Sequence, residues 1–469
     1  MLLSTKVGKA AYELAFHIAP LHGLLNDPNG LCEFKGVFHL FHQWNQTGLT
    51  HDNKSWGHLT SMDLVHWRRH SAALEPSEWY DKDGIYSGSA IEKDGVLHVF
   101  YTGNVINEDK TRSSYQCLAT SEDGFHFEKR GPILPHPEGY TRHVRDPKVW
   151  FDRKKQRYLL ILGAQKQTRL GDCLLYQSED LYTWEALGSL FSEEEISQLS
   201  QRGYMWECPD LITIGEQEFL IFSPQGFEAE EYRFHNLYQT GYLKVTKEKE
   251  KYKLVDAQFN EIDWGFEFYA PQTFERNGSR ILFGWMGPMM EEAEKNLPTN
   301  ALGWMHGLTI PRILSTKENQ FIQQPIKELQ QLRSQKKSFS LQKDWQISVD
   351  QLTYEILLDF PEGAEDFAFK IKNETQIKYE KEQRILSLTR RNWVSGQLES
   401  RKIKLTTELF HLQMYIDGSS LELFVNEGVA VATSRFFEEG ALQLTYQGEN
   451  NGKSILYALD TSQVMEGLE

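Results

Sequence analysis

Cysteine is scarce in this chain, which has four cysteines among its 469 residues. They are Cys32, Cys117, Cys173 and Cys208, and none of them are paired at the spacing that zinc ligands show. Four cysteines in a chain of this length do not indicate a disulfide framework. We therefore expect neither a disulfide scaffold nor a cysteine-based metal site.

Long apolar runs are also lacking. No run reaches the ~18 apolar residues that a membrane-spanning helix requires. The N-terminal residues show neither an apolar core nor a small-residue cleavage site, so we do not expect a signal peptide. Residues 9–15 have the pattern of a short amphipathic helix instead. We expect a cytoplasmic protein that has no membrane partner.

Positive charge is in deficit, because 50 Lys and Arg face 66 Asp and Glu, which gives a net charge of −16. Such a surface repels phosphate backbones and anionic lipids, so we expect no nucleic-acid or membrane partner. Aromatic residues are plentiful by contrast, with 12 Trp and 20 Tyr. They suit sugar binding, but β-rich cores favour them as well, so their number alone does not identify a function.

A strand-like apolar segment recurs five times in the first two thirds of the chain. The starts of these segments lie 59, 61, 60 and 62 residues apart. Each segment follows a turn-like stretch, which is typical of a β-hairpin. The segments are residues 39–45, 98–104, 159–165, 219–225 and 281–287. A fixed period in a strand-rich chain indicates a propeller, and five blades lie within the usual range. A two-sheet sandwich would not require equal spacing.

The pattern changes beyond Pro311. Residues 326–333 have helical spacing and follow Pro325, which suits a helix start. From about residue 337 polar and apolar residues alternate, which is typical of a β-sandwich. The predicted fold class is therefore all-β, a five-bladed β-propeller followed by a C-terminal β-sandwich. The predicted domains are a catalytic propeller at 1–320, a helical linker at 321–336 and a sandwich at 337–469.

The predicted sandwich shows no constellation of catalytic residues. We expect it to serve as a packing or assembly module, through which the chain can form a homo-oligomer.

Three acidic residues stand near the start of a repeat's first strand. Asp27, Asp146 and Glu207 lie 12, 13 and 12 residues ahead of the recurring segment of their repeats. If the first strand of each blade lines the axis, pseudo-symmetry gathers the three carboxylates around one pocket. Glycoside hydrolysis needs one protonated acid for the leaving oxygen and one ionised acid that attacks or activates water. A single acid before proline would be interpreted as a turn former, but three in phase favour a catalytic site.

Six short motifs, taken together and in this order, resemble glycoside hydrolase family 32, the invertases and sucrose-6-phosphate hydrolases. The resemblance covers nearly the whole chain. It implies a retaining hydrolase of terminal β-D-fructofuranosides, sucrose or sucrose 6-phosphate, which releases fructose through a fructosyl-enzyme. It implies no metal and no organic cofactor. The motifs are Asn26–Gly30, Trp56–His58, Tyr86–Ser89, Arg145–Pro147, Glu207–Asp210 and Tyr269–Gln272.

The same resemblance assigns roles to individual residues. It makes Asp27 the nucleophile, Glu207 the general acid/base and Asp146 the transition-state stabiliser that holds fructosyl hydroxyls. Arg145 would help to hold the sugar. The other positions that match the fructosyl pocket are Asn26, Gln43, Trp56, Tyr86, Ser87 and Trp285. For a retaining enzyme we expect ~5–5.5 Å between the two carboxyl groups of the nucleophile and the acid/base.

The chain departs from the family pattern at three places. Leu24 and Leu25 precede the first motif where Trp is frequent, Tyr86 replaces a frequent Phe, and Glu267 replaces a frequent Asp. These changes leave the chemistry intact and bear on leaving-group specificity. A fructan hydrolase or a fructosyltransferase with the same chemistry is therefore an alternative, and a non-catalytic carbohydrate-binding propeller is the alternative from another class.

A phosphorylated substrate would need basic partners at the rim of the pocket. Arg112, Arg142 and Lys54 are the candidates, although Lys and Arg in loops usually face solvent. Two weaker patterns carry no function. Residues 448–454 resemble a phosphate-binding loop but have the wrong glycine spacing, and we expect a hairpin there. Cys208 is expected to point away from Glu207, because side chains alternate along a strand.

Overall fold

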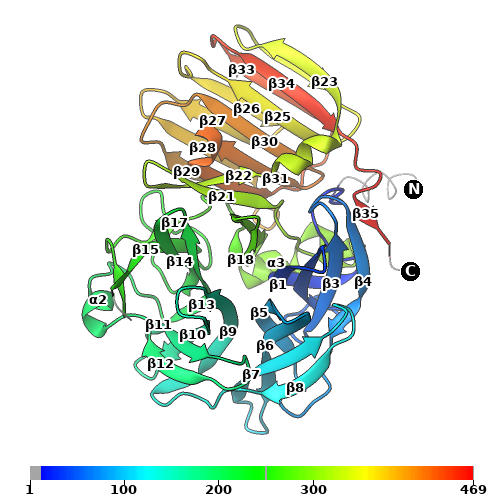
Figure 1. The fold of residues 1–469 in the computed structure, drawn as a ribbon. Coiled ribbons are helices and arrows are strands. Elements are labelled where there is room, and N and C mark those ends of the chain that lie inside the picture. Colours follow the sequence, from blue (N-terminus) through cyan, green and yellow to red (C-terminus); the bar gives the residue numbers. More distant parts are fainter. Residues whose placement is uncertain (1–11, 249–250, 468–469) are drawn as a thin grey trace.

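The computed structural model describes residues 12–248 and 251–467, and these form an all-β fold (Figure 1). The expected amphipathic helix at residues 9–15 lies mostly outside the described residues. Among the helices of the described residues, none combines the length and the apolar character that crossing a membrane requires.

Five sheets follow one another along the first two thirds of the chain. The first contains β1 (Gly23–Phe34), β2 (Val37–Asn45), β3 (Ser55–Ser61) and β4 (Trp67–Leu74), and the second contains β5 (Ile85–Lys93), β6 (Val96–Ile106), β7 (Arg112–Ser121) and β8 (Glu128–Pro132). The third contains β9 (Tyr140–Asp152), β10 (Arg157–Lys166), β11 (Gly171–Ser178) and β12 (Glu185–Ser189). The fourth contains β13 (Met205–Ile214), β14 (Gln217–Gln225), β15 (Gly241–Glu248), β16 (Lys251–Leu254) and β17 (Asn260–Glu261). The fifth contains β18 (Tyr269–Arg276), β19 (Ser279–Trp285), β21 (Arg312–Lys317) and β22 (Gln320–Pro325).

The recurring apolar segments form the second strand of each sheet, namely β2, β6, β10, β14 and β19. The turns ahead of them are hairpins, as predicted. Lys35-Gly36, Asp94-Gly95 and Asn277-Gly278 all have positive φ angles at both positions, between 49° and 79°. Two successive residues with positive φ match the right-handed twist of the paired strands, and glycine occupies the second position at no steric cost.

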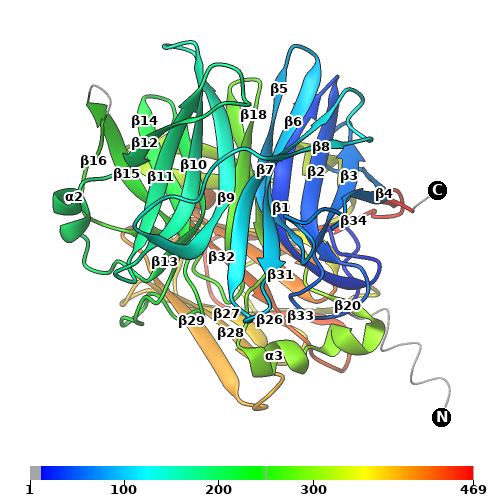
Figure 2. The ribbon, with the colours of Figure 1, turned by 90° about the horizontal axis from the view of Figure 1, so that it is seen from below.

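The first strands of the five sheets form a closed series of contacts. β1 contacts β5, β5 contacts β9, β9 contacts β13, β13 contacts β18, and β18 contacts β1 again. Figures 1 and 2 show these strands on the inside of the ring of sheets, with the later strands outside. Side chains near the beginning of each first strand are therefore directed toward one central space.

Each first strand carries a β-bulge close to its beginning, where one extra residue interrupts the pairing with the second strand. Each bulge leaves two residues of β1, β9 and β13 opposite one residue of the second strand. Asp27 is the second of the two in β1 and Asp146 is the first of the two in β9, whereas Glu207 lies directly before the pair in β13, whose first member is Cys208. A bulge re-aims side chains, which explains how acids in different positions still face the same space.

The last third of the chain forms two six-stranded sheets, which Figure 1 shows above the ring. An apolar core lies between them, and it includes Ile356, Phe369, Ile377 and Leu423. One sheet contains β23 (Arg333–Ser340), β34 (Lys453–Leu459), β25 (Thr353–Asp359), β30 (His411–Asp417), β31 (Ser420–Val425) and β32 (Ala430–Arg435). The other contains β24 (Trp345–Ser348), β33 (Gln443–Gly448), β26 (Phe367–Ile371), β27 (Thr375–Glu380), β28 (Ile385–Arg391) and β29 (Leu398–Lys404).

Two expectations for this region need correction. The helical linker predicted at 321–336 is restricted to a 3-10 helix at Lys327–Leu332, because the residues on both sides pair as strands β22 and β23. Residues 448–454 are not a hairpin, because β33 and β34 belong to different sheets.

Two short strands join the first sheet in parallel orientation. β20 (Trp304–Met305) pairs with β1, and β35 (Met465–Glu466) pairs with β4. β35 thus forms the outer edge of the first sheet, beside β4.

The N-terminal segment is attached to the C-terminal sheets by buried polar contacts. The backbone N–H groups of Ala15, Phe16 and His17 donate to the carboxylate of Asp417 at 2.7–2.9 Å. The imidazole of His17 lies between Asp417 and Glu422, at 2.8 and 2.9 Å. Burial lowers the pKa of His17, but the hydrogen bonds to both carboxylates outweigh it and raise that pKa to about 9.

Candidate active site

A cavity of about 490 Å³ lies where the five first strands meet. Every one of these strands contributes to its wall. β1 provides Asn26 and Asp27, β5 provides Tyr86, β9 provides Arg145 and Asp146, β13 provides Glu207, and β18 provides Tyr269. The structure therefore brings the three predicted acids into one cavity.

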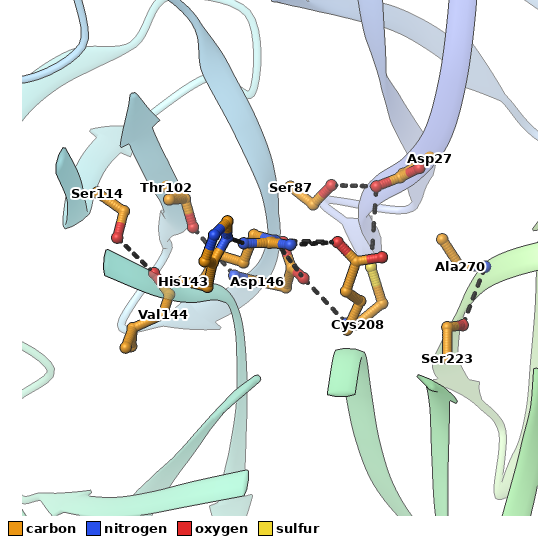
Figure 3. Close-up of polar contacts among 12 residues, drawn as sticks. Asp27, Ser87, Thr102, Ser114, His143, Val144, Asp146, Cys208, Ser223 and Ala270 are labelled. Atoms are coloured by element: carbon orange, nitrogen blue, oxygen red, sulfur yellow. Dashed lines mark hydrogen bonds and ion pairs between the residues drawn. The ribbon is translucent and has the colours of Figure 1, made fainter. Parts of the chain in front are cut away.

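The carboxylate of Asp27 is held by hydrogen bonds from three side chains. Asn26 Nδ2 donates to Oδ1 at 3.0 Å, and Ser87 Oγ and Gln43 Nε2 donate to Oδ2 at 2.5 and 3.3 Å. Figure 3 shows Ser87 directed at Asp27 from the neighbouring strand. Burial raises the pKa of Asp27, as does the charge of Glu207, while the bonds from Ser87 and Asn26 act in the opposite direction. The donors fix the orientation of a carboxylate that is half-buried in the cavity wall.

Asp146 is held by the side chain of Thr102 and by the backbone of Cys208. Its N–H donates to Thr102 Oγ1, and its Oδ2 accepts from the N–H of Cys208, both at 3.0 Å (Figure 3). Asp146 and Cys208 both have left-handed φ angles, 64° and 47°. Burial raises the pKa of Asp146 to about 7 against the charge of Arg145, which lowers it.

Strand alternation predicted that Cys208 points away from Glu207, but the side chain of Cys208 faces Asp27, another of the three acids. Its Sγ lies 3.8 Å from Oδ2 of Asp27, because the bulge interrupts the alternation at this residue. Burial raises the pKa of this thiol well above its usual value, so it stays protonated. The neutral thiol is a further, weak donor that faces Oδ2 of Asp27.

The carboxylate of Glu207 accepts four hydrogen bonds. Arg145 donates to Oε1 from Nε at 3.0 Å and from Nη2 at 2.6 Å. Oε2 accepts from Gln225 Nε2 at 2.7 Å and from the hydroxyl of Tyr269. Donors on both oxygens hold this side chain in a single orientation.

Arg145 also links Glu207 to His143. Its Nη1 lies 3.0 Å from Nδ1 of His143. Burial and the charge of Arg145 lower the pKa of His143, so the imidazole is neutral near pH 7. A guanidinium group can only donate, so Nδ1 must be the acceptor and Nε2 must carry the proton. His143 therefore keeps one N–H donor that is not used in this contact.

A buried lysine stands behind Asp27. Lys54 Nζ donates to Oδ1 of Asn26, whose amide also donates to Gln43 at 2.9 Å. Burial lowers the pKa of Lys54 to about 7, although the charges of Asp27 and Glu294 act in the opposite direction. This chain of contacts fixes which way the amide of Asn26 faces, and so it supports the hydrogen bond from Asn26 to Asp27.

The remaining predicted pocket residues divide into two groups. Asn26, Gln43, Tyr86, Arg145 and Trp285 line the cavity. Trp56 and Ser87 do not, and both are completely buried behind its wall. The indole N–H of Trp56 donates to the backbone oxygen of Tyr86 at 3.0 Å, so it supports the wall that Tyr86 forms.

Several residues at the site were not assigned a role from the sequence. Tyr269 occupies the same position in the fifth first strand as Glu207 does in the fourth, so the period could have identified it. Gln225 ends a recurring segment. Glu294 comes from the short helix α3 (Glu291–Lys295) and His51 from a loop, and no repeat pattern marks either of them.

His51, Glu294 and His306 form a cluster of three potential metal ligands. Both imidazoles lie 3.2 Å from the Glu294 carboxylate, and both pack against Trp285. Burial raises the pKa of Glu294, but the hydrogen bonds from His306 and His51 outweigh it and hold that pKa well below its usual value. The contacts are those of a hydrogen-bonded triad that supports the Trp285 side of the cavity.

Comparison with known families gives two matches that together span most of the chain. Residues 17–325 match the model of the glycosyl hydrolases family 32 N-terminal domain, and residues 319–462 match the model of the family 32 C-terminal domain.

Curated relatives are similar over most of their own length. A sucrose-6-phosphate hydrolase of Bacillus subtilis (strain 168) is 40% identical over 428 residues, which cover 90% of this chain and 88% of the relative. A sucrose-6-phosphate hydrolase of Klebsiella pneumoniae is 40% identical over 434 residues, which cover 92% and 90%.

Solved structures show the same similarity. A sucrose-6-phosphate hydrolase from Lactobacillus gasseri superposes with a TM-score of 0.87 at 29% identity, covering 98% of this chain and 96% of the other. A mutant of the GH32 beta-fructofuranosidase of Bombyx mori, in complex with sucrose, gives a TM-score of 0.85 at 30% identity, covering 99% and 97%.

Proposed function

The chain belongs to glycosyl hydrolase family 32, and from this premise we propose that it hydrolyses terminal β-D-fructofuranosides, namely sucrose or sucrose 6-phosphate, with retention of configuration and release of fructose. It is an enzyme, a glycoside hydrolase. One observation carries the proposal: Asp27, Asp146 and Glu207 share one cavity at the centre of the ring.

Asp27 is the proposed nucleophile. It attacks the anomeric carbon of the fructosyl group, the bond to the leaving oxygen breaks, and a fructosyl-enzyme ester forms. The hydrogen bonds from Ser87, Asn26 and Gln43 support this role, because they orient one oxygen toward a fixed point and stabilise the charge of the carboxylate before attack.

Glu207 is the proposed general acid/base. It donates a proton to the glycosidic oxygen in the first step and removes a proton from water in the second. Its hydrogen bonds from Arg145, Tyr269 and Gln225 support this role, because they fix where its two oxygens lie in the cavity. The separation of ~5–5.5 Å between the carboxyl groups of a retaining pair stays a prediction for this site.

Asp146 is the proposed transition-state stabiliser. It lies next to Arg145 in sequence and is held by the backbone N–H of Cys208, so its carboxylate has a fixed position beside the other two acids. A fixed acceptor can bind sugar hydroxyls more strongly as positive charge develops on the fructosyl ring. The other proposed substrate-binding residues are Asn26, Gln43, Tyr86, Arg145 and Trp285, which line the cavity, while Trp56 and Ser87 would support the substrate pocket from behind its wall.

We also propose that the five sheets are the blades of a five-bladed propeller and that the two C-terminal sheets form a β-sandwich. The closed contact order of the first strands and the regular sequence period support the propeller. The proposed domains are 1–320 and 337–469, joined by residues 321–336. The sandwich is a proposed packing or assembly module. A cytoplasmic location is also part of the proposal, because imported sugars are often phosphorylated as they enter the cell.

A fructan hydrolase or a fructosyltransferase would use the same chemistry with another leaving group or acceptor. Product analysis at high sucrose concentration separates transfer from hydrolysis, because a transferase forms oligosaccharides while a hydrolase releases equal amounts of glucose and fructose.

The proposal is tested by replacing the nucleophile. The wild-type enzyme should release fructose from sucrose or sucrose 6-phosphate and, in the presence of methanol, form the β-configured methyl fructofuranoside. Asp27→Asn removes the attacking charge without changing the shape of the side chain, and kcat should fall by a factor on the order of 10⁴ or more. Normal turnover in this variant, with an unchanged circular dichroism spectrum, would contradict the role of Asp27, and an α-configured product would contradict retention.

A further inference from the structure

Two histidines and one glutamate meet on the wall of the cavity and take no part in the proposed reaction. His51 lies in the loop between β2 and β3, Glu294 lies in α3, and His306 directly follows β20. His51 and Glu294 line the cavity, and His306 is completely buried. Two histidines and a glutamate are one of the ligand sets of zinc sites that keep the fourth position open.

The distances within this cluster are those between two ligands of one ion. Nε2 of His51 lies 3.2 Å from each oxygen of the Glu294 carboxylate, and Nε2 of His306 lies 3.2 Å from Oε1. Zinc bonds to nitrogen and oxygen are about 2.0–2.2 Å long, so two ligands of a tetrahedral ion stand roughly 3.3–3.6 Å apart. The ligand atoms of all three side chains lie within 4.8 Å of one another.

Other histidines of this protein lie closer to their acidic partners. His66, His126 and His411 are each 2.7 Å from the carboxylate of an aspartate, and His17 is 2.8 and 2.9 Å from its two acids. These are the usual lengths of hydrogen bonds to a charged group. The carboxylate of Glu294 instead stands at a longer distance from two imidazoles at once, which leaves the space that a shared cation needs.

The buried histidine has a ring nitrogen without a partner. Within residues 12–248 and 251–467, Nδ1 of His306 forms no hydrogen bond, although the side chain is completely buried. Buried polar atoms are normally hydrogen-bonded, so an exception of this kind calls for an explanation. A bond from Nε2 to a metal ion would compensate the ring for the missing contact at Nδ1.

A cation can reach the cluster from the cavity. The side chain of His51 is 42% exposed and that of Glu294 is 15% exposed, so the ligand atoms are accessible on one side. Trp285 packs against both imidazole rings and holds their planes in place. The net charge of −16 attracts cations to the molecule as a whole.

The second nitrogen of His51 connects the cluster with the proposed nucleophile. Lys54 Nζ lies 3.4 Å from Nδ1 of His51 and also donates to Oδ1 of Asn26, whose amide donates to Asp27. A cation bound to Nε2 of His51 repels the ammonium group on the other side of the ring. It therefore acts on the chain of contacts that orients Asp27.

We propose that His51, Glu294 and His306 form a Zn²⁺-binding site on the wall of the cavity and that Zn²⁺ bound there inhibits the enzyme. The bound ion has no role in the reaction itself. Its positive charge favours the ionised form of nearby carboxyl groups, whereas the proposed first step needs one of them protonated. The binding of zinc is independent of the proposed function, and the inhibition rests on it.

Titration calorimetry tests the binding. The wild-type protein, treated with EDTA and dialysed, should bind one Zn²⁺ per chain. His51→Ala removes a ligand from an exposed loop, and Glu294→Gln removes the carboxylate without changing the size of the side chain. Each should weaken the affinity for Zn²⁺ at least about 10-fold to 100-fold, since the loss of an outer partner of a metal ligand already has that effect.

Co²⁺ serves as a second probe, because its visible absorption reports a tetrahedral environment. The absorption bands should appear in the wild-type protein and be lost in His51→Ala. His126→Ala is the matched control: it removes an exposed histidine that is also paired with an acid but lies outside the cavity wall. This variant should bind Zn²⁺ and Co²⁺ as the wild type does.

The inhibition is measured on whichever of sucrose and sucrose 6-phosphate the enzyme cleaves. Zn²⁺ should lower kcat/KM of the wild type and of His126→Ala, and EDTA should restore it. His51→Ala should need at least about 10-fold more Zn²⁺ for the same inhibition, in line with its weaker binding.

The two proposals fail in different ways. A wild-type protein that binds no Zn²⁺, or an unchanged affinity in both His51→Ala and Glu294→Gln, overturns the zinc site even if sucrose is hydrolysed. Bound Zn²⁺ that leaves turnover unchanged overturns the inhibition. Hydrolysis of neither substrate overturns the proposed function, while calorimetry and the Co²⁺ spectrum still decide whether the zinc site exists.

Discussion

The ring of five sheets and the pair of C-terminal sheets use the same secondary structure in opposite ways. In the C-terminal sheets the pairs β25–β30, β27–β28 and β30–β31 run from end to end without a shift in register. In the ring, every first strand is interrupted by a bulge near its beginning. Continuous pairing keeps the alternation of side chains regular, so one face of the sheet can be wholly apolar. A bulge interrupts this alternation and can direct polar side chains toward the central cavity.

The interiors differ accordingly. The space between the C-terminal sheets is filled by fully buried apolar side chains, among them Ile377 and Leu423. The space at the centre of the ring is a cavity walled by carboxylates and their hydrogen-bond donors. The ring of five sheets thus serves the chemistry and the C-terminal sheets serve stability. Three sets of variants test this division.

The largest effect is expected at Glu207. Glu207→Gln cannot transfer a proton, so kcat on sucrose should fall by about 10²-fold to 10⁴-fold, the contribution of general acid/base catalysis. A fructoside whose leaving group needs no protonation should lose less in the first step. Steady-state kinetics on both substrates measure the difference.

The control lies in the other region. Glu374 is also held by an arginine, Arg391, but on the C-terminal sheets, so Glu374→Gln should leave kcat unchanged. Equal losses on both substrates for Glu207→Gln would contradict its role as the acid.

The next effect concerns stability. Ile377 on β27 is completely buried in the core between the C-terminal sheets. Ile377→Ala leaves a cavity and should lower the free energy of unfolding by about 2–5 kcal/mol, and Ile377→Val by about 0.5–1.5 kcal/mol. Urea denaturation measures both values. The kcat of the folded variants should be that of the wild type, and a loss of kcat in a fully folded variant would contradict the division of roles.

The smallest effect concerns the junction between the two regions and depends on pH. The pKa of His17 is raised to about 9 by Asp417 and Glu422, above an unfolded value of about 6.5. Its stabilising contribution is therefore complete below pH 6.5 and is lost as the pH rises through about 9. Over that interval the free energy of unfolding should decrease by up to about 1.4 kcal/mol per pH unit from this group.

Thermal unfolding at a series of pH values measures this slope. His17→Gln should flatten it. His126→Gln, which changes an exposed histidine also paired with an aspartate, should keep it. A slope that is the same in all three proteins would show that His17 is not the group responsible.

Much of the ring could be predicted from the sequence. The period of the apolar segments identified the second strand of each sheet, since apolar residues recur there at nearly constant spacing and turn residues precede them. The same period brought Asp27, Asp146 and Glu207 to one cavity. Regular, local patterns of this kind are visible in the sequence because each repeat forms the same pair of strands.

Features that depend on irregular or distant pairing were missed. The three acids stand at different positions around the bulges of β1, β9 and β13, and the bulge in β13 turns Cys208 toward Asp27. A period counted in residues reveals neither of these features. Trp56 was expected in the cavity but lies behind its wall, since its neighbours in space, not in sequence, decide its burial. The linker helix was overestimated because β22 forms a hairpin with β21 directly before it, and because β23 pairs with β34 from a remote part of the chain.

The short strand β35 has a consequence for the order in which the protein is made. Met465 and Glu466 pair with Trp67 and Arg68 on β4, almost four hundred residues earlier in the chain. A ribosome synthesises the N-terminal part first, at about 5–20 residues per second. The outer edge of the first sheet therefore waits, uncovered, for tens of seconds until Met465 and Glu466 emerge, and a nascent chain stalled before these two residues should offer that edge to chaperones or to another unfinished copy.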